Sequence, residues 1–153
     1  MTFPNSIKSR SYTDTESVGI ALARTMLETT ALPRFVALYG DLGVGKTAFT
    51  RGFTSVIAPG ARVKSPTFAL VNQYKGDKLS VFHFDMYRIE SEEELYSIGF
   101  FDYTESKNIC ITEWSENIEY ALPTTFVRVE IIKDDPNDTD SRRIDIQLVT
   151  ATL

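Results

Sequence analysis

The segment at residues 40–47 constrains the fold of this chain more than any other. It reads Gly-Asp-Leu-Gly-Val-Gly-Lys-Thr and matches the pattern G-x-x-x-x-G-K-[ST]. Glycines in such a loop let the backbone curl tightly and turn its N–H groups towards an anion. Lys46 supplies a positive charge for the outer phosphates of a nucleotide, and the hydroxyl of Thr47 is a suitable magnesium ligand. The pattern therefore predicts a phosphate-binding loop at the positive end of a helix.

The residues on either side of this segment support that prediction. Residues 35–39 form a short continuous apolar run, which is typical of a strand buried on both faces. The apolar residues after the loop recur with the spacing of one helix face: Phe49, Phe53, Val56 and Ile57. Pro59 and Gly60 predict that this helix ends near Ala58. A strand, a glycine-rich loop and a helix in this order indicate binding of a nucleoside triphosphate.

Composition narrows the class of protein. The chain has 153 residues, of which 42% are hydrophobic and 24% are charged, and we expect one ordinary globular domain over 1–153. A net charge of −5 argues against a broad basic surface for nucleic acid. No run of 18 apolar residues and no signal-peptide pattern occurs, so we expect a cytoplasmic protein without membrane contact. Cys110 is the only cysteine and lies in an apolar run, which predicts a buried, inert thiol.

The remaining segments predict an α/β protein. Residues 1–12 lack periodicity and are expected to be loosely ordered. A helix is predicted to begin near residues 13–16 and to end before Pro33, with an apolar face through Val18, Ala21, Leu22 and Leu27. Residues 68–74 and 79–84 predict a hairpin. Ser91 and Glu94 predict the capped start of a short helix that closes at Gly99.

Three further strands complete the prediction. Residues 108–112 form a buried apolar run, and residues 127–131 and 144–148 alternate between apolar and polar side chains. The segment at 133–141, rich in Asp, Pro and Asn, is expected to be a solvated loop between the last two strands. The predicted fold is a three-layer P-loop NTPase domain whose central sheet mixes parallel and antiparallel strands.

Two acidic residues at strand ends are candidates for holding magnesium. Asp85 follows residues 81–84, and Glu113 follows residues 109–112. The spacing leaves both open, and it also leaves open that each merely ends a strand. His83, two residues before Asp85, is expected to be a partly buried residue hydrogen-bonded near the site rather than a general base. The acidic run at residues 92–94 is explained by the preference of a helix N-terminus for acids.

Several motifs together resemble one known family. They are Gly-Asp-Leu-Gly-Val-Gly-Lys-Thr at 40–47, Thr-Arg-Gly at 50–52, Lys-Ser-Pro-Thr-Phe at 64–68, His-Phe-Asp-Met-Tyr-Arg at 83–88, Glu94-Leu95, Gly99 and Glu-Trp-Ser-Glu at 113–116. In this order the set resembles the TsaE (YjeE) family of bacterial P-loop ATPases over residues 13–150. Thr112 departs from the family pattern, in which an apolar residue usually precedes the glutamate.

The resemblance implies a role in making N6-threonylcarbamoyladenosine at position 37 of tRNAs that read codons beginning with adenine. In that family the protein is the ATPase that associates with the transferase pair TsaD and TsaB. It therefore implies ATP and Mg²⁺ as cofactors, and TsaD-like and TsaB-like proteins as partners. It also implies that contact with tRNA is only indirect or weak.

The resemblance also implies roles for particular residues. Thr47 and Glu113 match the magnesium ligands, and Asp85 matches a second essential acid. Catalysis is expected to depend on Asp85, Lys46 and Glu113. Contacts with the nucleotide are expected from residues spread over four segments: Thr15, Asp41, Leu42, Gly43, Val44, Gly45, Lys46, Thr47, Thr67 and Trp114.

Two other functions fit parts of the sequence. A small-molecule kinase usually closes an arginine-bearing lid over the transferred phosphate, but residues 89–127 contain no arginine and only Lys107 is basic. A nucleotide-gated binding module with negligible hydrolysis would use the same residues as a slow ATPase. Near the loop the basic residues are Arg51, Lys64 and Arg88, and the helix after the loop is expected to carry Arg51 away from the phosphates. We therefore expect a low intrinsic rate and dependence on partner proteins.

Overall fold

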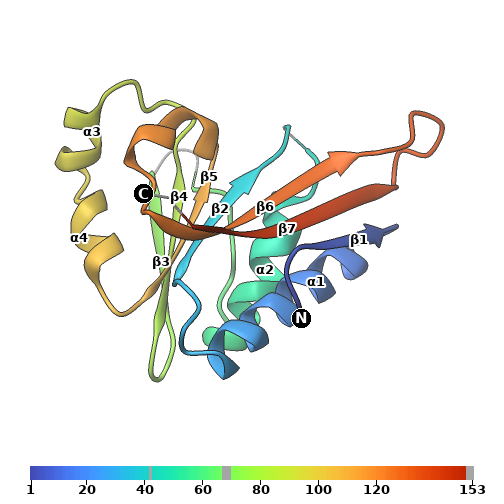
Figure 1. The fold of residues 1–153 in the computed structure, drawn as a ribbon, viewed down its shortest axis with the longest axis horizontal. Coiled ribbons are helices and arrows are strands. Elements are labelled where there is room, and N and C mark those ends of the chain that lie inside the picture. Colours follow the sequence, from blue (N-terminus) through green and yellow to red (C-terminus); the bar gives the residue numbers. More distant parts are fainter. Residues whose placement is uncertain (42, 67–69, 151–153) are drawn as a thin grey trace.

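Strand β2 (Phe35–Tyr39), which leads into the 40–47 loop, lies in the middle of a mixed β-sheet (Figure 1). The computed structural model describes residues 1–41, 43–66 and 70–150. Within these residues the sheet has seven strands: β1 (Asn5–Ser9), β2, β3 (Val71–Lys75), β4 (Ser80–Asp85), β5 (Ile109–Glu113), β6 (Thr125–Lys133) and β7 (Arg142–Thr150). The helices are α1 (Tyr12–Glu28), α2 (Lys46–Ile57), α3 (Glu92–Ser97), α4 (Phe100–Glu105) and the 3₁₀ helix η1 (Ser115–Ala121).

The strand order across the sheet is β1-β7-β6-β2-β5-β4-β3. The four central strands β6, β2, β5 and β4 are parallel, whereas β7, β1 and β3 are added by antiparallel pairing. The carboxyl ends of the parallel strands meet at one edge of the sheet, which is where open α/β sheets bind ligands. The structure thus confirms the predicted α/β fold with a mixed sheet.

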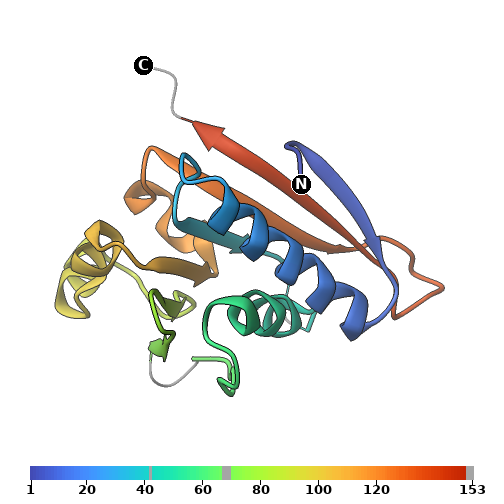
Figure 2. The same ribbon diagram turned by 90° about the horizontal axis from the view of Figure 1, so that it is seen from below.

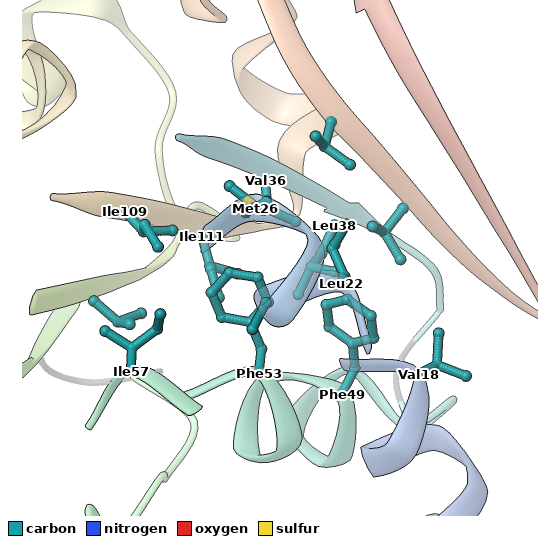
Figure 3. Close-up of a cluster of buried hydrophobic side chains, with 14 of the residues drawn as sticks. Val18, Leu22, Met26, Val36, Leu38, Phe49, Phe53, Ile57, Ile109 and Ile111 are labelled. Carbon is teal, nitrogen blue, oxygen red and sulfur yellow. The ribbon is translucent and has the colours of Figure 1, made fainter. Parts of the chain in front are cut away.

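Helices cover both faces of the sheet. Helices α1 and α2 lie side by side on one face, and α3, α4 and η1 lie on the other (Figures 1 and 2). Figure 3 shows the aromatic side chains of α2 pointing into the first layer, towards strands β2 and β5: Phe49 and Phe53 against Leu38 and Ile111. Strand β2 contributes alternate residues to both layers and is buried along its whole length, as its apolar sequence predicted.

Helix α2 ends at Ile57 with Ala58 as its C-cap, which confirms the predicted end. Helix α1 begins earlier than predicted, because Ser11 caps it by accepting a hydrogen bond from the Asp14 N–H at 3.0 Å. The prediction for its apolar face was wrong at Ala21 and Leu27, which are exposed. The buried face is instead Thr15, Val18, Gly19, Leu22, Ala23 and Met26.

The N-terminus differs from the sequence-based expectation of a loosely ordered segment. Asn5–Ser9 forms strand β1, which pairs with the first half of β7 in antiparallel register. Ile7 is the one apolar residue of the strand, and it packs against the core beside α1 and α2. Strands β1 and β7 lie near opposite ends of the sequence, so local periodicity could not predict that they pair. Helices α4 and η1 were not predicted either.

A tight crossing of α1 and α2 leads to a prediction about stability. A Cβ atom at Gly52 would lie 2.0 Å from the Glu16 carbonyl oxygen, and one at Gly19 would lie 2.2 Å from the Phe49 carbonyl oxygen. Backbone atoms cannot yield as a flexible side chain can, so the two helices would have to separate. We expect Gly52→Ala to lower the free energy of unfolding by about 1–3 kcal/mol.

Urea unfolding followed by circular dichroism measures this change. Arg24→Ala, on the exposed side of α1, is the control and should stay within about 0.5 kcal/mol of wild type. A Gly52→Ala protein as stable as the Arg24→Ala protein would show that the helices repack without cost.

Candidate functional site

The 40–47 loop connects the buried strand β2 to helix α2. Gly45 caps α2 with a φ of 117°, a backbone conformation that costs side-chain-bearing residues energy. The cap has no side-chain hydrogen bond, so the first N–H groups of α2 remain available for an anion. The local geometry is therefore suited to an anion such as phosphate.

Lys46, the first residue of α2, folds back over this loop. The residue is 6% exposed, and Nζ donates a hydrogen bond to the Gly40 carbonyl oxygen at 2.7 Å. The same ammonium lies 4.3 Å from the centre of the Trp114 ring, within the range of a cation–π interaction. Lys46 thus contacts both the loop and the segment that follows β5.

The two candidate acids lie side by side at the carboxyl ends of neighbouring strands. Asp85 of β4 pairs in register with Glu113 of β5. Both residues are buried: Asp85 is 6% exposed and Glu113 is 5% exposed. Strand β5 lies between β4 and β2, so Glu113 is one strand away from the loop and Asp85 is two strands away. Asp85 Oδ1 accepts a hydrogen bond from the Tyr87 N–H at 2.9 Å, which holds the turn that follows β4.

One cleft of about 760 Å³ brings most of the predicted residues together. Its lining comes from α1, the loop and α2, the segment before β3, and the ends of β4 and β5: Tyr12, Gly43, Gly45, Lys46, Thr47, Ala48, Arg51, Ser65, Asp85, Tyr87, Glu113 and Trp114. A cleft of this size accommodates a nucleotide. Hydroxyl and carboxylate oxygens from Thr47, Asp85 and Glu113 are the donors that magnesium prefers, so the residues fit that ion.

A second, smaller cavity of about 210 Å³ lies beside the loop. Thr15 and Val44 line it, and Tyr12 lines both cavities. Thr15 Oγ1 is buried at 2.7 Å from Ser9 Oγ, so β1 helps to fix its position. The Val44 side chain belongs to the core, while its carbonyl oxygen accepts a hydrogen bond from Arg142 Nε at 2.9 Å.

Among the described residues, one predicted nucleotide contact lies outside both cavities. Asp41 is exposed and is not among the described residues that line either cavity. Leu42 and Thr67 lie outside the described residues.

The structure adds residues that sequence reasoning missed. Tyr12, Ser65 and Tyr87 line the cleft, and Arg142 supports the loop from β7. Ser65 and Tyr87 lie within the motifs that carry the family resemblance, whereas Tyr12 and Arg142 had no local signal. Arg51 lines the cleft, although we expected α2 to carry it away; its Nη1 lies 3.2 Å from Glu16 Oε1 of α1.

The turn after Glu113 is held by hydrogen bonds. Trp114 has a φ of 56°, which is uncommon for a residue with a side chain. Ser115 Oγ donates to the Thr112 carbonyl oxygen at 2.8 Å and lies 2.7 Å from Thr112 Oγ1. The hydroxyl of Thr112, where the family usually has an apolar residue, thus has a buried partner. The Trp114 ring packs on Tyr87 with a centroid distance of 4.9 Å.

Other side chains outside the cleft are accounted for more simply. Cys110 is 1% exposed, and burial raises the pKa of its thiol to about 12, as expected of an inert cysteine.

Across the described ranges, no three His, Cys, Asp or Glu side chains are grouped so that they could hold a metal ion by themselves. In the same residues, no helix is both long and apolar enough to cross a membrane.

Comparison with known proteins gives the family. The family model described as threonylcarbamoyl adenosine biosynthesis protein TsaE matches residues 9–144. A Haemophilus influenzae protein named tRNA threonylcarbamoyladenosine biosynthesis protein TsaE is 41% identical over 111 residues, which are 72% of this chain and 68% of that protein. Proteins of the same name from Bacillus subtilis and Rickettsia bellii are 38% and 34% identical, over 63% and 82% of this chain and 60% and 87% of theirs.

A solved structure supports the same conclusion at the level of the fold. The crystal structure of Bacillus subtilis YdiB superposes with a TM-score of 0.74 at 25% sequence identity, covering 99% of this chain and 90% of that one. The match of the family model, these relatives and this structure agree with the motifs around the cleft. The chain belongs to the TsaE family.

Proposed function

We propose that this protein binds ATP with Mg²⁺ in the 760 Å³ cleft, hydrolyses it slowly, and supports the formation of N6-threonylcarbamoyladenosine in tRNA. The relatives' names supply the modification. TsaD-like and TsaB-like proteins are the proposed partners, as the family resemblance implies. Any contact with tRNA is proposed to be indirect or weak.

One observation carries the ATPase part of the proposal. A glycine-rich loop, the uncapped start of α2, a buried lysine and two strand-end carboxylates all line one cleft. The N–H groups and Lys46 suit the phosphates of a nucleotide, and the carboxylates suit a cation beside them. A site for a neutral ligand would have no use for this combination of charges.

Each residue has a proposed role. Lys46 binds the outer phosphates. To do so, its Nζ gives up the hydrogen bond to the Gly40 carbonyl oxygen and donates to a phosphate oxygen instead. Thr47 and Glu113 would hold magnesium, which when bound neutralises negative charge on the phosphate oxygens. Asp85 orients water or a neighbouring group, since its Oδ1 is fixed by the Tyr87 N–H and its strand is further from the loop.

Two measurements test this function. Calorimetric titration with ATP and Mg²⁺ should show one binding site, and phosphate release should be slow but measurable. In a reaction with the TsaD-like and TsaB-like proteins, tRNA and the threonylcarbamoyl donor, adding this chain and ATP should increase the number of modification turnovers. Binding without any phosphate release would favour the nucleotide-gated binding module, and no binding would contradict the proposal.

Replacing each strand-end acid separates their roles. We expect Glu113→Gln to raise the magnesium concentration needed for tight nucleotide binding by about 10-fold or more, because a metal ligand loses its charge. We expect Asp85→Asn to leave that concentration nearly unchanged and to slow phosphate release by about 100-fold. A magnesium titration and a phosphate-release assay on both variants measure these effects. The opposite pattern would mean that the roles of the two acids are exchanged.

A further inference from the structure

His83 is the only polar side chain of β4 between its first and last residues, and it is completely buried. It lies two residues before Asp85 and on the same face of the sheet as Val81, which belongs to the core under α1 and α2. Burying an imidazole among apolar residues costs free energy unless its nitrogens are hydrogen-bonded. The hydrogen-bond contacts of the imidazole ring therefore indicate the role of His83.

The ring makes one polar contact within the described residues. His83 Nε2 lies 2.7 Å from Glu113 Oε2, on the neighbouring strand β5. Nδ1 is buried and has no hydrogen-bond partner among the described residues. The pairing register places His83 beside Ile111, so the imidazole reaches diagonally to the end of β5 to meet the carboxylate.

The chemistry of the pair fixes the direction of this hydrogen bond. A carboxylate that binds a cation is ionised and only accepts, so in the proposed site Nε2 donates the hydrogen bond to Glu113 Oε2. This hydrogen bond restricts rotation of the carboxylate, and the described residues give Oε1 no such contact with the ring.

We propose that His83 is a positioning residue, which holds the carboxylate of Glu113 in the orientation that binds magnesium beside the nucleotide. This inference rests on the proposed function, because it assigns Glu113 to the metal. Carboxylates that bind metals are themselves commonly hydrogen-bonded, and losing such a partner costs about 10- to 100-fold in metal affinity. A histidine buried only for packing would have no such effect, because any residue of similar shape would replace it.

Three substitutions at His83 separate these roles. Glutamine places its amide nitrogen near the position of Nε2 and keeps a donor for Glu113. Asparagine is too short to do so, and phenylalanine fills the space without any donor. Cys110→Ala, a buried change on the opposite face of β5, is the control for general loosening of the sheet.

The readout is the magnesium concentration that half-saturates the ADP complex, measured by calorimetry and repeated with Mn²⁺ by electron paramagnetic resonance. We expect His83→Phe and His83→Asn to raise this concentration about 10- to 100-fold. His83→Gln should restore most of the affinity, and Cys110→Ala should match wild type. ADP binding without divalent metal should stay within about twofold in all variants, because it does not use Glu113.

Other outcomes overturn the inference. Equal metal affinity in wild type and the folded asparagine variant would show that the hydrogen bond does not position Glu113. The same would follow if His83→Gln lost as much metal affinity as His83→Asn. It would also follow if ADP binding without metal fell as much as metal affinity did. If His83→Phe fails to fold, the comparison of glutamine with asparagine decides. In a Glu113→Gln background, His83→Asn should add no further loss. A wild-type protein that binds no nucleotide would instead overturn the proposed function together with this inference.

Discussion

Replacing Lys46 with alanine is expected to weaken ATP binding by about 10- to 100-fold. Lys46 is buried at the start of α2 and is the only lysine or arginine that is buried among the described residues. A hydrogen bond to a charged group contributes about 1.5–3 kcal/mol, and about 1.4 kcal/mol corresponds to a tenfold change in affinity. Phosphate release should fall further than binding, because the charge also stabilises the transition state.

The neighbouring variant, Thr47→Ala, should behave differently. Thr47 supplies a neutral hydroxyl to the cleft, and its proposed contact is with magnesium rather than with phosphate. We expect ATP binding to change by less than about fivefold, while phosphate release falls by about 100-fold. Calorimetric titration and a phosphate-release assay on the same preparations separate binding from turnover.

Two controls keep these comparisons interpretable. Lys78→Ala removes a lysine from the exposed β3–β4 turn and should match wild type in both assays. Thermal unfolding shows whether Lys46→Ala still folds, since the substitution also removes the donor to the Gly40 carbonyl oxygen. Unchanged binding and unchanged turnover in both variants would contradict a phosphate site at this loop.

The parts of the site that could be predicted from sequence depend on short segments. A strand, a loop and a helix are consecutive in residues 35–57, so apolar spacing and glycine positions were enough to predict them. Asp85 and Glu113 were predicted because each directly follows a buried apolar run. The family resemblance then assigned Glu113 to magnesium where spacing alone left both acids open.

The missing parts depend on which strands are neighbours. No local pattern shows that β5 lies between β2 and β4, yet this order brings His83 to Glu113 and places Glu113 nearer the loop than Asp85. Arg142 reaches the Val44 carbonyl oxygen from 98 residues away along the chain. Strand β1 was missed for the same reason, because its pairing with β7 depends on backbone hydrogen bonds rather than on apolar periodicity.

The small number of arginines near the proposed phosphate site leads to the prediction with the largest effect. P-loop hydrolases that are fast bring an arginine to the developing charge, from the same chain or from a partner, and this is worth about 10³–10⁵ in rate. Arg51 is the one arginine that lines the cleft among the described residues, and its Nη1 is paired with Glu16 of α1. Lys64 and Arg88 are exposed in the segments before β3 and after β4.

The mouth of the cleft has features of a surface that binds another protein. Tyr12 and Tyr87 are 73% and 59% exposed, and both line the cleft together with Trp114. Large aromatic side chains are enriched at protein interfaces, where they bury much area at a small cost in conformational entropy. A partner docked here would lie close to the proposed phosphate site and would be able to supply the missing positive charge.

We therefore expect the isolated chain to release phosphate slowly, and the TsaD-like and TsaB-like proteins to increase the rate by about 10³-fold or more. Arg51→Ala should leave the accelerated rate within about threefold of wild type, because we expect the partner to supply the arginine that meets the developing charge. Trp114→Ala should lose most of the acceleration, whereas Tyr120→Ala, which removes an exposed aromatic residue of η1 that does not line the cleft, should keep it. Steady-state phosphate release with and without the partners measures all four proteins. An isolated chain that is already fast and gains nothing from partners would contradict a partner-completed site, and a large loss in Arg51→Ala would show that the arginine comes from this chain itself.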